Sequence, residues 1–103
     1  MLRVRLARVA DLPLDDLRAF PVDGLTWPVL AGVIGGAVVA TAGVCPHEDV
    51  GLAGGTVEDG CLTCPGHGYQ FDLATGACRH DRSLLLRRYR AIVLDGEVWI
   101  ELV

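Results

Sequence analysis

The chain has 103 residues, of which 51% are hydrophobic and 6% aromatic, and 13 are glycine. A chain of this length holds one domain with a modest core, because it buries only about 60–65% of the surface that its unfolded form exposes. The high hydrophobicity excludes a disordered protein, and the formal net charge of −4 excludes a typical nucleic-acid-binding domain.

The first half of the chain predicts short strands separated by turns. The opening segment alternates arginine with aliphatic residues, the pattern of a half-buried strand, and a turn follows. Asp23-Gly24 and Gly35-Gly36 are hairpin signals. The strands expected here cover residues 4–9, 18–22, 26–33 and 37–41.

The segment from Leu25 to Val44 carries no charge and has nearly the length of a membrane span. Pro28 and Gly35-Gly36 interrupt it, so two buried strands around a tight turn are the better interpretation. The early arginines resemble a charged leader, but the polar stretch after them does not continue a signal peptide. We therefore expect a cytoplasmic protein that does not bind membranes.

The second half again predicts strands rather than helices, because turn residues recur at short intervals. The pattern as a whole indicates one all-β domain over residues 1–103, an antiparallel β-sandwich or barrel. The strands expected here cover residues 57–60, 61–63, 69–72, 86–94 and 98–103.

Two short motifs carry the metal-binding chemistry. Cys45-Pro46-His47 is followed, after about 16 residues, by Cys64-Pro65-Gly66-His67. Each motif supplies one thiolate and one imidazole, and a loop, unlike a strand, can aim neighbouring side chains at the same point. Two such loops on hairpins can close over one metal centre.

The motifs resemble the Rieske family, in the sequence Cys-Pro-His … Cys-Pro-x-His-Gly-Tyr-x-Phe-Asp. The resemblance extends from Trp27 to the C-terminus. It implies a Rieske fold, with a small cluster-binding subdomain of two loops on hairpins at about residues 43–72. It also implies a [2Fe–2S] cluster whose first iron is bound by Cys45 and Cys64 and whose second iron is bound by His47 and His67.

Departures from the family pattern affect the expected redox potential. High-potential members carry a further disulfide between the loops, and the matching positions here are Val50 and Gly66. They also donate two hydroxyls to the cluster sulfurs, whereas Phe71 has no hydroxyl to donate. We therefore expect a potential near the low end of the Rieske range, about −150 mV. The family's proline-rich segment is also absent, since Arg79 to Leu84 contains no proline.

The resemblance implies an electron carrier and not an enzyme. Rieske oxygenases need a second iron site with two histidines, and this chain has three histidines in all. No Gly-x-Gly-x-x-Gly motif indicates a nucleotide site. The chain is similar to the monomeric ferredoxins of bacterial dioxygenase and diiron monooxygenase systems for aromatic hydrocarbons. Those ferredoxins take electrons from a flavin-dependent NADH reductase and pass them to a terminal oxygenase.

The charge distribution predicts how such partners would bind. All nine basic residues are arginine, and none falls between Arg18 and Arg79. That interval contains Glu48 and Asp49 beside the first motif. We expect these carboxylates and the histidine edge to meet basic patches of the partners in short-lived, charge-steered complexes.

Other interpretations stay open. The four residues could hold structural zinc in an interaction module, although zinc fingers usually pair cysteine with cysteine in each half. The chain could instead be the Rieske-like small subunit of an assimilatory nitrite reductase. Cys61 and Cys78 are expected to be half-buried thiols and His80 a surface residue. Tyr69 is expected to pack beside the cluster, and core positions are expected for Trp27, Tyr89 and Trp99.

Overall fold

Residues 2–102, which the computed structural model describes, form nine strands and two short 3-10 turns. The expected all-β class is confirmed. The large sheet consists of β1 (Arg3–Arg8), β2 (Arg18–Phe20), β3 (Val29–Ile34), β4 (Ala37–Ala42), β8 (Arg88–Leu94) and β9 (Glu97–Glu101). The small sheet consists of β5 (Thr56–Glu58), β6 (Cys61–Thr63) and β7 (Gln70–Asp72).

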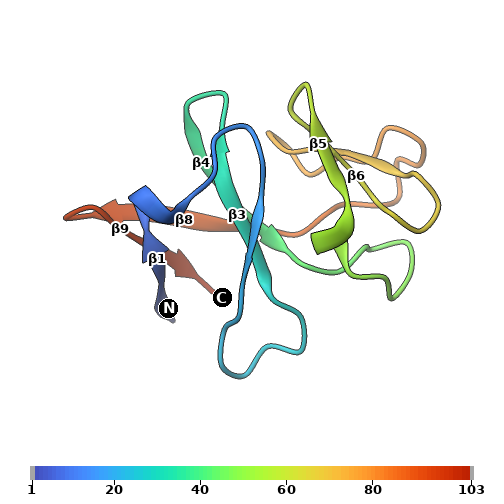
Figure 1. The fold of residues 1–103 in the computed structure, drawn as a ribbon. Helices are drawn as coiled ribbons and strands as arrows, with labels where there is room; N and C mark the ends of the chain where they lie inside the picture. The colour runs from blue at the N-terminus through green and yellow to red at the C-terminus, as the bar shows by residue number, and fades with distance from the viewer. Residues whose placement is uncertain (1, 103) are drawn as a thin grey trace.

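The large sheet is antiparallel and has the order β1-β9-β8-β4-β3-β2. Figure 1 shows that it curls, with β5 and β6 of the small sheet standing to one side. The first and last strands pair with each other at the opposite end of the molecule. The small sheet has the order β5-β6-β7, and its loops lie far from the paired strands at the two ends of the chain.

Strand β3 joins the two halves of the molecule because both of its faces are buried. Val29 and Ala31 point into the core of the large sheet, where they join Ile100. Leu30, on the opposite face, packs with Leu62 and other residues of the second core, which lies under the small sheet. Side chains alternate along a strand, so one apolar segment serves two cores. The burial of both faces explains why this run carries no charge, and it packs the small sheet against the large one.

None of the helical segments in residues 2–102 has the length and apolar character of a membrane span.

The hairpin turns agree with the turn residues in most places. Gly35 and Gly36 have φ of +57° and +85°, which fits a two-residue turn between β3 and β4. The prediction of a tight hairpin at Asp23-Gly24 was wrong. The strands on either side are joined by an eight-residue loop, and Phe20 pairs with Val29 across it. Pro21 and Pro28 at the ends of that loop lack the N–H that a strand would use. The last predicted residue of the final strand, Val103, lies outside the described residues.

The arginines of β1 are surface residues of a paired strand. Arg5 forms an ion pair with Glu97, and Arg3 lies 3.6 Å from Glu101 in the neighbouring strand β9. Cross-strand pairs of opposite charge stabilise a sheet modestly. The basic N-terminal segment is thus explained by its place in the sheet.

Candidate metal centre

The two Cys/His motifs lie in loops that are closed by the same backbone pattern. The N–H of Cys45 donates to the carbonyl of Val50 over 2.9 Å, and the N–H of Cys64 donates to the carbonyl of Tyr69 over 2.8 Å. In each loop the cysteine thus pairs with the residue five positions later. The first loop follows β4, and the second connects β6 to β7.

The two cysteines lie together and are buried, with exposed fractions of 3% for Cys45 and 1% for Cys64. Burial raises the pKa of the Cys45 thiol, the backbone N–H groups of His47 and Glu48 oppose that shift, and the Cys64 thiol lies within hydrogen-bonding reach. The N–H of Gly66 points at Cys64 Sγ over 3.5 Å. Amides directed at sulfur favour the thiolate form, which is the form that binds metals.

The two histidines lie at the outer edge of the same site. Their ring centroids are 5.4 Å apart and their planes are nearly perpendicular. The His67 side chain is 63% exposed, whereas that of His47 is 31% exposed. The structure therefore brings the four predicted residues into two adjoining pairs, with the thiols inside and the imidazoles outside.

Glu48 occupies a position that sequence reasoning missed. Its Oε1 atom lies 2.5 Å from His67 Nδ1 and 3.6 Å from His47 Nδ1, and the side chain is 24% exposed. The carboxylate therefore turns inward, instead of presenting its charge to a partner as expected. Only the general preference of carboxylates for imidazole, and no spacing signal, could have suggested this contact.

The donor set fits an iron-sulfur centre with unlike ends. The ring nitrogens of His47 and His67 converge on one point, which the Glu48 oxygen marks, and the three groups lie within 4.8 Å of one another. A cation bound between the imidazoles would replace this contact. The buried thiols on the inner side are suitable sulfur donors. Two cysteines and two histidines are the ligands of Rieske centres.

The segment after β7 also reaches the site, at the place where the family pattern has its proline-rich segment. The Tyr69 ring lies against the His47 ring, with centroids 4.1 Å apart, and the His80 ring lies 5.9 Å from the Tyr69 centroid. Tyr69 thus packs beside the site as expected, and His80 is exposed as expected. Arg79 and Arg82 lie near His80 in the sequence, and both are exposed.

The remaining cysteines are more deeply buried than predicted. Cys61 is in β6, where it pairs with Asp72, and Cys78 forms a bridge with Phe71. Their exposed fractions are 4% and 7%. Neither lies in a Cys/His motif, so both fall outside the predicted ligand set.

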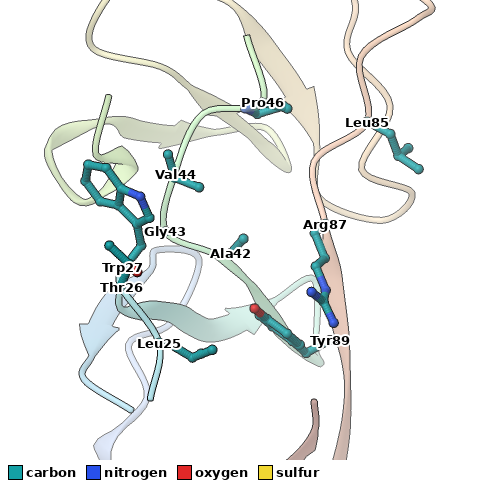
Figure 2. Close-up of a pocket in the computed structure, with 10 residues that line it drawn as sticks. All are labelled: Leu25, Thr26, Trp27, Ala42, Gly43, Val44, Pro46, Leu85, Arg87 and Tyr89. Atoms are coloured by element: carbon teal, nitrogen blue, oxygen red, sulfur yellow. The ribbon is translucent and has the colours of Figure 1, made fainter. Parts of the chain in front are cut away.

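An apolar groove of about 280 Å³ runs beside the first loop (Figure 2). Trp27 stands on one side of it and Leu85 on the other, with Pro46 at one end. The guanidinium of Arg87 covers the Tyr89 ring at 4.8 Å. Trp27 therefore lines a surface groove, and the prediction that it is a core residue was wrong, whereas Tyr89 lines the groove and also packs against the core of the large sheet. Trp99 is also only partly buried.

Comparison with known proteins agrees with this geometry. The family model of the Rieske [2Fe-2S] domain matches residues 3–89. The chain belongs to the Rieske family. The predicted fold and the predicted [2Fe–2S] cofactor are thereby confirmed.

Small ferredoxins resemble this Rieske chain over its whole length. The ferredoxin of Sphingomonas yanoikuyae B1 superposes with a TM-score of 0.86 at 26% identity, covering 99% of this chain and 100% of the other. The ferredoxin of carbazole 1,9a-dioxygenase from Nocardioides aromaticivorans IC177 gives 0.82 at 29% identity, with 97% of each chain covered. The anthranilate 1,2-dioxygenase ferredoxin subunit of Burkholderia cepacia is 35% identical over 72 residues, 69% of this chain and 67% of that protein.

Larger Rieske proteins match only in part. The oxygenase component of dicamba O-demethylase from Stenotrophomonas maltophilia is 34% identical over 73 residues, and the match covers 63% of this chain but 21% of that protein. The chain thus spans about a fifth of the length of this curated relative. Nitrite reductase small subunits also superpose, at 24% and 20% identity, and these likenesses show the shared fold alone.

Proposed function

We propose that this Rieske protein is a one-electron carrier and that Cys45, Cys64, His47 and His67 are its cluster ligands. The observation that carries the proposal is that two matched loops bring two buried thiols together on the inner side and two imidazoles together on the outer side. The likeness to whole ferredoxins, in addition to domains of larger enzymes, supports a carrier over an enzyme. It also supports a single domain over residues 1–103, with the cluster-binding loops within about 43–72.

A bound [2Fe–2S] cluster supplies reversible one-electron chemistry. The chain then has three tasks. Cys45 and Cys64 would hold one iron at the edge of the second core, where amide N–H groups would offset the negative charge on sulfur. His47 and His67 would hold the other iron, and as neutral ligands they would favour the reduced state more than thiolates. His67, with the more exposed side chain, offers the shortest way to a partner.

The proposed partners are a flavin-dependent NADH reductase and a terminal oxygenase, met in turn in the cytoplasm by a monomeric carrier. The names of the similar ferredoxins, from dioxygenase systems and an alkene monooxygenase system, support this role. A shuttle needs small interfaces, below about 1,200 Å², so that it can leave quickly. The exposed Asp49 remains available to steer a basic partner surface, whereas Glu48 is turned inward.

The ligand assignment is tested by exchanging one donor at a time. His47→Ala and His67→Ala should each abolish the Rieske electron paramagnetic resonance signal of the reduced protein. Cys61→Ser and Cys78→Ser are the matched controls, because these buried thiols lie outside the two Cys/His loops, and their signals should be unchanged. Loss of the signal in either serine variant would overturn the ligand set. A purified protein that contains zinc but neither iron nor acid-labile sulfide would overturn the carrier function.

A further inference from the structure

The two histidines of the site differ in what covers them. The Tyr69 ring lies between the rings of His47 and His80, tilted by 34° to each, with centroid distances of 4.1 and 5.9 Å. The described residues place no such stack over His67 beyond its edge-on contact with His47. The site therefore has an open side at His67 and a covered side at His47.

Backbone contacts hold His80 in this place. The N–H of Arg79 donates to the carbonyl of Gln70 over 2.9 Å, which fixes the segment beside β7. On the other side, the Asp81 carboxylate accepts hydrogen bonds from the Ser83 hydroxyl at 2.6 Å and the Ser83 N–H at 2.9 Å. His80 thus follows a residue that is bonded to β7 and precedes a turn that Asp81 and Ser83 close, so its position does not depend on the ring contact alone.

We infer that Tyr69 and His80 are positioning residues whose stacked rings shield the His47 side of the cluster from water. The inference rests on the proposed role of His47 as a ligand. It gives a function to a segment that lacks the prolines expected beside the cluster, from Arg79 to Leu84. In this chain an aromatic stack covers the site at that place.

The stack should affect the reduction potential through water. Reduction adds one negative charge, and water stabilises that charge better than apolar groups do, so the shell around a site tunes its potential. Removing the cover should therefore raise the potential and let more water approach His47. An uncharged aromatic ring at position 80 should shield His47 as well as the histidine does, because the shielding depends on the ring and not on its ionisation.

The test compares His80→Ala with His80→Phe in the cluster-loaded protein. His80→Ala should shift the midpoint potential upward and strengthen the deuterium coupling seen by pulsed electron paramagnetic resonance in D₂O. His80→Phe should match the wild type in both measurements. Arg82→Ala, an exposed change in the same segment, is the control for altered charge and should leave the deuterium coupling unchanged.

A double-mutant cycle with Tyr69→Ala separates the stack from independent effects. Once Tyr69 is absent, His80→Ala should add no further shift. The inference is overturned if His80→Ala behaves like the wild type, if His80→Phe shifts as much as His80→Ala, or if the two effects simply add. Should Tyr69→Ala fail to fold, the two His80 variants still decide. A wild-type protein without a Rieske signal would instead refute the proposed function, so the two failures are distinguishable.

Discussion

Phe71 should link the stability of the fold to the retention of the metal centre. The side chain is 0% exposed and belongs to the same buried core as Cys45 and Cys64. It pairs across β7 and β6 with Leu62, which is also fully buried. Removal of this ring would leave a cavity directly beneath the two loops.

The magnitude follows from complete burial. Truncating a fully buried phenylalanine to alanine costs about 3–5 kcal/mol, as lost transfer free energy plus the cavity that remains. A domain of this size has a total stability of about 5–15 kcal/mol. With a urea dependence of about 1–3 kcal/mol per molar, Phe71→Ala should lower the unfolding midpoint by roughly 1–5 M.

Urea titration of the oxidised, cluster-loaded protein measures this effect. Circular dichroism reports the strands and visible absorbance reports the cluster, and the two transitions should coincide in both proteins. Phe71→Leu, which keeps most of the volume, should cost less than about 1.5 kcal/mol. Leu94→Ala, at an exposed position, should change stability by less than about 0.5 kcal/mol. A cost below about 1 kcal/mol for Phe71→Ala, or loss of the cluster long before the strands, would refute the shared core.

Three further predictions concern the loops, a turn and the partners. Gly55→Ala should destabilise the protein by more than Gly66→Ala in the same urea titration. An added Cβ at Gly55 meets a backbone carbonyl of β6, whereas an added Cβ at Gly66 meets the movable carboxylate of Glu48. Equal losses of stability in the two variants would contradict this prediction. The hydroxyl and N–H of Ser83 lower the pKa of Asp81, so the ionised carboxylate stabilises the fold above the unfolded pKa, and this contribution is lost as the pH falls through the folded pKa. Ser83→Ala should raise the pKa of Asp81 in a carboxyl NMR titration, and an unchanged value would show that another group sets it. Finally, increasing salt should slow electron transfer to an oxygenase partner if charge steers the encounter, whereas a salt-independent rate would count against steering.

The sequence alone determined the features that depend on neighbouring residues. A turn or a pleat is set by the residues that form it, so its signal is local. Such local patterns are the Cys45 and Cys64 motifs, the turn at Gly35-Gly36 and the alternation along the strands. These patterns were sufficient for the all-β class and for the family. They also identified the four residues that the structure brings together.

Only the tertiary structure decided how the two sides of the site differ. Glu48 reaches His67 across the two loops, and His80 reaches Tyr69 from a segment beyond β7. Trp27 lines a groove because the loop before β3 lies on the surface, although its apolar character suggested a core position. Such contacts depend on which strands pair and how the sheets dock, and neither composition nor spacing along the chain contains that information.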